Sequence, residues 1–195
     1  MTPQVSAILL AAGSSRRMGQ LKQLLPLGNK PIIRHCLESI IGSGVKDVVV
    51  VLGSDSGSII KGIRDLSLNI VFNTNAESEM ADSIRIGLKA VNNSSKASLI
   101  CLSDHPLISV QTIKKIIKKH NECPDNIIIP VYNERRGHPS LFPTNILKEI
   151  FLGFNLREII ERNSEKISFL NVTDEGILCD VDTINDYKAI LKKKR

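Results

Sequence analysis

Short apolar runs alternate along the chain with segments whose apolar residues recur at helical spacing. The runs that predict strands span residues 5–10, 48–52, 70–72, 98–102 and 127–130. The segments that predict helices between them span residues 31–41, 58–66, 81–91 and 110–120. This alternation predicts a three-layer α/β fold, in which a mainly parallel, twisted sheet is covered by helices on both faces. Ligands bind such sheets outside the carboxyl ends of the strands, so the loops after the first, third and fourth strands are the places to inspect.

The regular alternation of predicted strands and helices ends at residue 130. Residues 131–142 predict a hairpin or a small inserted lobe. After it we expect helices near 144–151 and 156–162, short strands over 167–172 and 177–179, and a closing helix over 183–191. Since no internal repeat is evident, we expect the 195 residues to form one domain. Its parts are a first half at about 1–130, a lobe at about 131–182 and a basic tail at 192–195.

The net charge of +6 is concentrated in two places. Residues 1–37 contain five basic residues and no acid, and residues 192–195 are all basic. A protein that coats duplex DNA more often spreads its basic residues over a broad face. The absence of Trp and the 4% aromatic content disfavour stacking on single strands. We therefore expect a local anion site and a solvated tail rather than a nucleic-acid partner, although the charge of the tail leaves that partner open.

Apolar runs and cysteines indicate a protein of the cytoplasm. No run approaches the roughly 18 apolar residues of a membrane span, so no membrane partner is expected. The first apolar run lacks a basic segment before it and leads into a Gly/Ser turn, which is unlike a signal peptide. The four cysteines are far apart and form no CxxC pair, which is typical of free packing residues in a reducing compartment.

The loop after the first predicted strand is the most informative stretch of the chain. Gly13 and Gly19, with small side chains between them, allow backbone N–H groups to approach an anion. Arg17 and Lys22 can add charge-assisted contacts to phosphate oxygens. The loop is neither a Walker A motif, because Gln20 stands where that motif needs Lys, nor a GxGxxG motif. The alternative is an ordinary Gly/Ser turn, but its place after a buried strand, in a stretch without acids, favours anion binding.

This loop also carries a resemblance to a known family. Residues 10–22 match the pattern LAAGxSxRMGxxK and are followed by GNKP at 28–31. The pattern resembles the signature of nucleotidyltransferases that attach a nucleotide to molybdopterin, within the larger superfamily with the Rossmann-like, nucleotide-diphospho-sugar transferase fold. The resemblance implies that the loop holds a nucleoside triphosphate and that Arg17 and Lys22 contact its phosphates. The other loop residues that it assigns to the nucleotide are Leu10, Ala11, Ala12, Gly13, Ser14 and Ser15. Ala at position 12 resembles the cytidylyl-transferring branch, whereas the guanylyl-transferring branch usually has Gly there.

A second matching segment spans residues 73–88. It resembles the Nx(5)GMxxSixxGl stretch that lines the nucleoside in this family, with Glu79 in place of the usual Gly. The resemblance places Asn73 and Ser83 in the nucleotide site. Taken by itself, Ser83 is an ordinary exposed serine of a helix.

A third segment, Ser103-Asp104-His105-Pro106-Leu107, resembles the GDQPL turn of the family. A carboxylate at the end of a central strand, facing a phosphate loop, is where a magnesium ligand is needed. We therefore expect Asp104 to bind Mg²⁺; the alternative is a plain cap of the next helix. Ser103 replaces Gly and His105 replaces Gln, and both changes keep the carboxylate. His105 is interpreted as a loop residue rather than a catalytic base.

Two further segments resemble the family near the carboxyl terminus. Residues 179–187 resemble the DiDTpeDy motif, in which Asp180 and Asp182 would point the same way on an extended strand. Asp182 is the expected second magnesium ligand, while Thr183 and Asp186 suit the start of the next helix.

Residues 136–142 resemble the rGHPvlF segment on the acceptor side of the family's pocket, which makes His138, with Asp180, an acceptor-side candidate. The family's Gly-Asp-x-Gly-(Ala/Leu)-Arg segment is altered here to Gly153-Phe154-Asn155-Leu156-Arg157, which leaves the acceptor open.

Together these segments imply a Mg²⁺-dependent nucleotidyltransferase that transfers CMP from CTP to the molybdopterin cofactor and releases pyrophosphate. Arg17, Lys22 and Asp104 are the expected catalytic residues, residues 1–130 the nucleotide-binding half and residues 131–182 the acceptor-side lobe. The product would serve the maturation of a molybdenum hydroxylase. One alternative is guanylyl or cytidylyl transfer to a sugar or polyol phosphate. Another is a non-catalytic protein that delivers the cofactor, but a carrier would not need two carboxylates.

Overall fold

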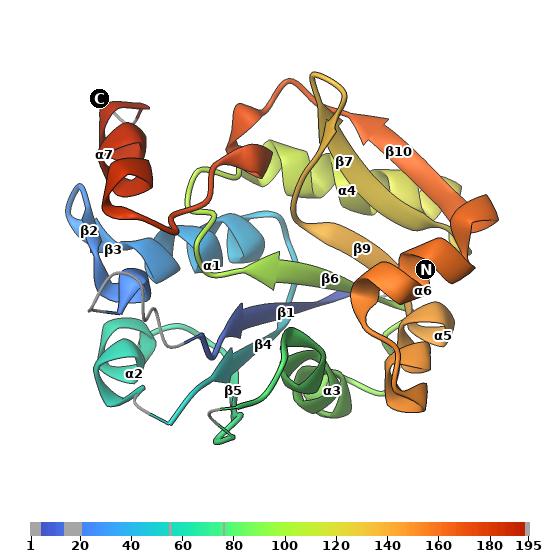
Figure 1. Cartoon of the computed structure of the whole chain (residues 1–195), viewed down its shortest axis with the longest axis horizontal. Coiled ribbons are helices and arrows are strands. Elements are labelled where there is room, and N and C mark those ends of the chain that lie inside the picture. Colours follow the sequence, from blue (N-terminus) through green and yellow to red (C-terminus); the bar gives the residue numbers. More distant parts are fainter. Residues whose placement is uncertain (1–4, 14–20, 55, 76, 194–195) are drawn as a thin grey trace.

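The computed structural model describes residues 5–13, 21–54, 56–75 and 77–193 (Figure 1). One large sheet runs through the molecule in the order β10-β7-β9-β6-β1-β4-β5, with β8 (Arg135–Arg136) paired to β7. The strands of this path are β1 (Val5–Ala11), β4 (Asp47–Leu52), β5 (Asn69–Phe72), β6 (Ala97–Leu102), β7 (Ile127–Tyr132), β9 (Ser140–Pro143) and β10 (Ile167–Asn171). Neighbouring strands of this path are parallel except around β9, which is antiparallel to both β6 and β7, and β8 is antiparallel to β7.

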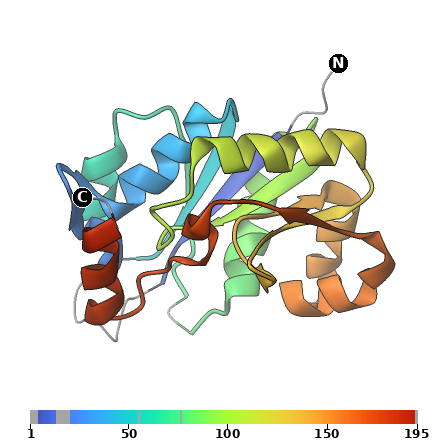
Figure 2. The same ribbon diagram turned by 90° about the horizontal axis from the view of Figure 1, so that it is seen from above.

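Helices cover both faces of this sheet, as Figure 2 shows. One face carries α1 (Ile32–Gly42), α2 (Gly57–Ile63) and α4 (Val110–Glu122). The other face carries α3 (Met80–Ala90), α5 (Thr144–Leu147), α6 (Leu156–Arg162) and the 3₁₀ helix η3 (Lys148–Leu152). Shorter 3₁₀ turns are η2 (Lys22–Leu24), η4 (Ser164–Lys166) and η5 (Glu175–Leu178). The expected three-layer α/β fold is therefore confirmed.

The central strand shows why the alternating pattern specifies this architecture. All seven residues of β1 are buried, because β4 and β6 flank it and helices cover both of its faces. Successive side chains point to opposite faces, so Leu9 packs in the cluster under α1 and α4 and Ile8 packs in the cluster under α3. Gly87 lets α3 approach closely, since a Cβ atom there would lie 2.5 Å from the Cγ2 atom of Ile8.

The last helix, α7 (Ile184–Lys193), lies at the carboxyl edge of the sheet, near the small hairpin of β2 (Pro26–Leu27) and β3 (Lys30–Pro31) (Figure 1). A separate apolar cluster joins them, in which Leu27 and Ile32 pack with Val181 and Ile190. These contacts fix α7 to the β2–β3 hairpin and to the start of α1.

The segment after residue 130 differs from the expectation in two places. Residues 131–136 form the expected hairpin of β7 and β8, but β9 lies inside the main sheet instead of in a separate lobe. The expected strand over 177–179 is wrong, because Glu175–Leu178 forms the 3₁₀ turn η5. Asp180 and Asp182 accordingly lie in a segment without regular secondary structure.

Two further expectations concern cysteines and membranes. Cys36, Cys101, Cys123 and Cys179 are all free, as their spacing predicted. Within the described part of the chain, no helix combines the length and the apolar character that crossing a membrane requires.

Candidate active site

A cavity of about 250 Å³ opens at the carboxyl edge of the sheet, between the ends of β1 and β6 and the start of α3. The backbone N–H of Ser103, after β6, donates to the carbonyl oxygen of Leu10 in β1 at 3.2 Å, which holds the two strand ends together. The residues that line this nucleotide-side cavity include Leu10, Ala12, Gly13, Lys22, Gln23, Met80, Ser83 and Asp104. Ala11 is buried as the last residue of β1. Ser14, Ser15 and Arg17 lie outside the described residues.

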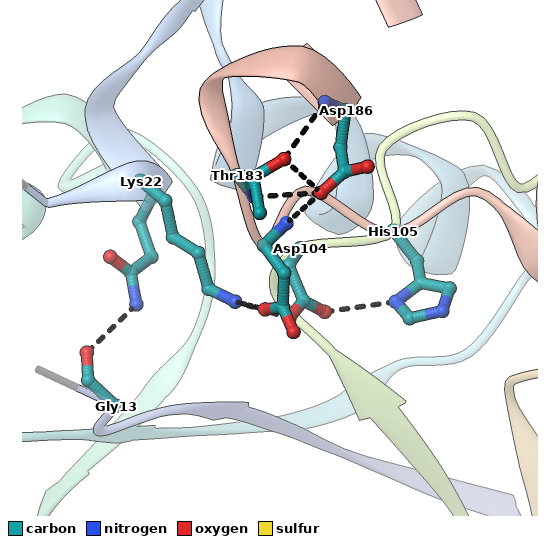
Figure 3. Close-up of polar contacts among 8 residues, drawn as sticks. Gly13, Lys22, Asp104, His105, Thr183 and Asp186 are labelled. Atoms are coloured by element: carbon teal, nitrogen blue, oxygen red, sulfur yellow. Dashed lines mark hydrogen bonds and ion pairs between the residues drawn. The ribbon is translucent and has the colours of Figure 1, made fainter. Parts of the chain in front are cut away.

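Lys22 lies between two carboxylates that are far apart in the sequence. Its Nζ atom is 2.6 Å from Oδ2 of Asp104 and 2.8 Å from Oδ1 of Asp182. The Lys22 and Asp104 side chains are only 14% and 17% exposed, whereas Asp182 is 45% exposed. Figure 3 shows Lys22 and Asp104 pointing toward one another. The structure thus brings together three of the residues that the sequence had marked.

The charges of this cluster act on each other's protonation. Burial alone would raise the pKa of Asp104, but hydrogen bonds from His105 and Lys22 lower it well below its usual range. Burial would lower the pKa of Lys22, yet Asp104 and Asp182 hold it above its usual value. Both groups are therefore charged at neutral pH, and the ammonium neutralises carboxylates that would otherwise repel each other.

Asp182 reaches the cluster because the preceding backbone is attached to the loop after β6. The N–H of Val181 donates to the carbonyl oxygen of Asp104 at 3.0 Å. On the other side, the N–H and hydroxyl groups of Thr183 both donate to a carboxylate oxygen of Asp186 at 2.7 Å, as Figure 3 shows. Asp186 therefore serves the start of α7, as the sequence predicted. Asp180 is exposed and does not share this arrangement.

Asn73 and Ser83 are adjacent, but they contribute differently. Asn73 is buried and its Nδ2 atom donates to the hydroxyls of Ser78 at 2.8 Å and Ser83 at 2.9 Å. Ser83 lines the cavity, whereas Asn73 is not among the described residues that line it. Ser83 is also buried rather than an exposed helix serine. Asp82 accepts a hydrogen bond from the Glu79 N–H at 3.0 Å, which fixes the start of α3 where the family usually has Gly.

Sequence reasoning missed two polar residues of this site. Gln23 is buried, lines the cavity, and donates through Nε2 to the carbonyl oxygen of Gly13 at 3.3 Å. His105, interpreted from the sequence as a loop residue, is buried with its Nδ1 atom 2.8 Å from Oδ1 of Asp104. An Asp–His pair directly after a strand was the one signal that pointed to this contact.

A larger cavity of about 640 Å³ adjoins the first one at Met80, which lines both. Its wall combines apolar side chains with a few polar ones. The residues that line this acceptor-side cavity include Ile84, Ile100, Arg136, His138, Ser140, Phe142, Asn155, Leu156, Arg157 and Ile160. Leu156 and Arg157 belong to the altered segment 153–157, so the departure from the family pattern lies in the wall of this cavity.

His138, which the sequence marks as an acceptor-side candidate, lies between this cavity and the carboxylate cluster. Its ring packs edge-on against the ring of His105, with centroids 5.3 Å apart. Burial and, to a smaller extent, the neighbouring His105 lower the pKa of His138 to about 4, although the carboxylates of Asp104 and Asp180 act in the opposite direction. The backbone N–H of His138 donates to the carbonyl oxygen of Ile177 at 3.0 Å. A neutral imidazole is therefore held at the cavity wall.

The two carboxylates fit a hard divalent cation whose remaining ligands come from substrate phosphates and water. Oxygens of Asp104 and Asp182 both approach one cationic group, Nζ of Lys22. Among the described residues, no group of three or more His, Cys, Asp or Glu side chains could hold a metal ion. Magnesium is commonly bound by one or two carboxylates plus substrate phosphates and water, rather than by a cage of protein ligands.

Comparison with known proteins assigns the chain to a family. The profile of the MobA-like NTP transferase domain matches residues 7–165. The chain belongs to this family. This MobA-like chain is accordingly a nucleotidyltransferase.

The MobA-like chain has relatives with different names. A probable molybdenum cofactor guanylyltransferase of Natranaerobius thermophilus is 33% identical over 71% of this chain and 64% of that protein. A nicotine blue oxidoreductase of Paenarthrobacter nicotinovorans is 26% identical over 97% of both chains.

The fold is shared with solved structures. The crystal structure of Rv0371c from Mycobacterium tuberculosis covers 98% of this chain and 99% of that one, with a TM-score of 0.85 and 25% identity. Rv0371c has also been solved in complex with manganese, and that structure aligns with a TM-score of 0.81 at 22% identity.

Proposed function

We propose that this nucleotidyltransferase transfers CMP from CTP to the molybdopterin cofactor with release of pyrophosphate, in a Mg²⁺-dependent reaction that serves a molybdenum hydroxylase. The observation that carries the proposal is the convergence of Lys22, Asp104 and Asp182 at the carboxyl edge of the sheet, beside a second and larger cavity. The manganese complex of Rv0371c supports the divalent metal.

In this proposal the chain's own residues bind and orient the substrates. The loop after β1 and Ser83 hold the nucleotide, and the Lys22 ammonium turns from the carboxylates to the phosphates, together with Arg17. Asp104 and Asp182 would hold Mg²⁺, which supplies neutralisation of the charge on the phosphates. An oxygen of the acceptor phosphate attacks the α-phosphorus in line, and the bond to the leaving pyrophosphate breaks. Since that phosphate is already anionic, the step needs positioning and charge stabilisation rather than a general base.

The acceptor-side cavity favours a planar heterocycle over a sugar or polyol phosphate. Ile84, Ile100, Phe142 and Ile160 offer an apolar surface on which a ring system can pack, whereas the hydroxyls of a polyol would lose their hydrogen bonds there. The exposed Arg136 lines the same cavity and suits an anionic group. The name of the Natranaerobius relative points to the same acceptor.

The choice of CTP rests on Ala12, while the name of the Natranaerobius relative points to GTP. Ala12 lines the nucleotide-side cavity, where the guanylyl-transferring pattern has Gly. The test is pyrophosphate release by purified protein with molybdopterin and Mg²⁺, with CTP, GTP, ATP and UTP supplied separately. CTP should give the highest kcat/KM; turnover with GTP alone would refute the base assignment.

The same assay tests the metal ligand. Asp104→Asn should reduce kcat by about two orders of magnitude or more, because it removes a charge that the transition state needs. Asp65→Asn is the matched control, since Asp65 lies on the surface in an ion pair with Arg34. Equal rates for wild-type protein and Asp104→Asn would exclude Asp104 from catalysis. CTP binding without pyrophosphate release with any phosphate acceptor would favour a delivery protein instead.

An oxidoreductase activity is a second candidate, because the Paenarthrobacter relative matches along nearly its whole length. Oxidation of NADH or NADPH by a heteroaromatic dye, measured without CTP or molybdopterin, separates the two candidates. Dye reduction that survives Asp104→Asn, without pyrophosphate release by the wild-type protein, would support the oxidoreductase.

A further inference from the structure

His105 lies between the two cavities and contacts a residue of each. On one side its Nδ1 atom is 2.8 Å from Oδ1 of Asp104, which lines the nucleotide-side cavity. On the other side its ring packs against His138, which lines the acceptor-side cavity, at an interplanar angle of 71°. The His105 side chain is only 8% exposed, so both contacts are shielded from water.

The hydrogen bond has a defined direction. An ionised carboxylate only accepts, so Nδ1 of His105 carries the proton and donates it to Asp104. The other carboxylate oxygen, Oδ2, faces the Lys22 ammonium. Lys22 and His105 thus contact different oxygens of Asp104, and together they restrain rotation of the carboxylate. The His105 contact would remain available if a divalent cation took the place of the ammonium.

The ring of His105 is in turn positioned by the wall of the acceptor-side cavity. His138 approaches it edge-on, and Gly137 allows the backbone there to lie against Ile177, where a Cβ atom would be 2.6 Å from the carbonyl oxygen of Ile177. Nδ1 of His138 is buried and has no hydrogen-bond partner among the described residues. Packing, rather than hydrogen bonding, thus joins the two rings.

We propose that His105 is a positioning residue that orients the Asp104 carboxylate for the divalent cation and is itself held by His138, so that the acceptor-side wall sets the geometry of the metal ligand. The inference rests on the proposed function, in which Asp104 holds Mg²⁺. Hydrogen bonds to ligating carboxylates tune a metal site, and their loss typically lowers metal affinity about 10- to 100-fold.

The test is Mn²⁺ binding to the nucleotide-free protein, measured by electron paramagnetic resonance for wild type, His105→Phe, His105→Asn, His138→Ala and Asp104→Asn. His105→Phe keeps an aromatic ring beside His138 but removes the donor, so its Kd for Mn²⁺ should rise about 10- to 100-fold. The side-chain amide of Asn places an N–H near the position of Nδ1, so His105→Asn should bind Mn²⁺ more tightly than His105→Phe. His138→Ala should raise the Kd about two- to tenfold through the lost ring contact.

The outcomes separate this inference from the proposed function. A wild-type Kd in His105→Phe refutes the inference, provided that Asp104→Asn binds Mn²⁺ more weakly than wild type. Equal Kd values for wild type and Asp104→Asn refute the metal role of Asp104, and the inference with it. Thermal unfolding of each variant identifies a folding defect; if His105→Phe does not fold, the comparison of His105→Asn and His138→Ala with wild type decides in the same way.

Discussion

Replacing Lys22 by Met removes a cation that the two carboxylates share. Met has a similar length and an apolar stem, so the substitution keeps packing and deletes the charge. Among the described residues, the Asp104 side chain then keeps the His105 contact and is 17% exposed, whereas the Asp182 side chain is 45% exposed. We expect the variant to fold and to be less stable than wild type at neutral pH.

The magnitude follows from the exposure of each pair. A hydrogen bond to a charged group contributes about 1.5–3 kcal/mol when it is buried, which applies to Asp104. The half-exposed Asp182 adds about 0–1 kcal/mol, because solvent screens it. The expected loss is therefore about 1.5–4 kcal/mol. For a domain of this size that lowers Tm by about 3–16 °C.

The stability difference between wild type and Lys22→Met depends on pH and on metal through the same groups. The pKa of Asp104 is lowered in the folded state, so its contribution is present above the ordinary Asp pKa of about 4 and is lost only as the pH falls below that value. At pH 7 the difference between wild type and Lys22→Met is therefore fully developed. Mn²⁺ should raise the Tm of Lys22→Met more than that of wild type, because no ammonium competes for the carboxylates. At 100 times the Kd, the ion restores about 2.7 kcal/mol.

Differential scanning calorimetry at pH 7, with and without Mn²⁺, measures both effects. Lys30→Met is the matched control, since the ion pair of Lys30 with Glu38 is 39% and 35% exposed and should change stability by less than about 1 kcal/mol. If Lys22→Met melts with wild-type Tm, or gains no more from Mn²⁺ than wild type does, the placement of Lys22 as a shared counter-ion is wrong.

Three other predictions concern different parts of the molecule. His138, whose pKa is about 4, is neutral in the folded state, so the free energy of unfolding should fall by up to about 1.4 kcal/mol per pH unit as pH decreases from about 6.5 to 4. In urea unfolding, the free energy of unfolding of His138→Gln should decrease less over this pH range than that of wild type; equal pH dependence of the two proteins would contradict this. Gly87→Ala forces a Cβ atom against Ile8 and should cost about 1–3 kcal/mol, whereas Gly57→Ala, with nothing within 4 Å, should be neutral; equal Tm values would argue against the close approach. Ile160→Trp fills the acceptor-side cavity and should raise the acceptor KM at least about tenfold, while an equal loss of CTP affinity would show that the two cavities are not separate sites.

The sequence predicted the buried strands well because parallel strands covered on both faces are continuous apolar runs. It failed at residues 177–179, where the short apolar run contributes a buried Ile177 to a 3₁₀ turn whose Gly176 N–H is bonded to Asp174. A run of that length does not distinguish a strand from a buried turn. The pattern of apolar residues also did not predict that β9 lies inside the sheet, because strand pairing depends on partners that are distant along the chain.

The sequence identified several residues of the candidate site, but it did not predict the contacts between them. Lys22, Asp104 and Asp182 could each be found from motifs, but their mutual ion pairs join positions 82 and 160 residues apart, which no local pattern reveals. For the same reason His105 was interpreted as a loop residue. The hydrogen bond of His105 depends on how the turn after β6 folds. The sequence shows only that His stands where the family motif has Gln, and this does not predict the contact.

The late position of Asp182 has a consequence for how the protein is made. The Asp104 loop and Lys22 are synthesised long before the segment that holds Asp182, and that segment is kept in place by the Val181 contact and by the packing of α7 on the β2–β3 hairpin. A chain truncated before α7 can form the sheet and keeps both carboxylates, but it loses the packing on the β2–β3 hairpin that helps to hold Asp182 in place. The cluster is therefore completed only after residues 182–193 are synthesised, and truncation of α7 would weaken it while the two large core clusters persist.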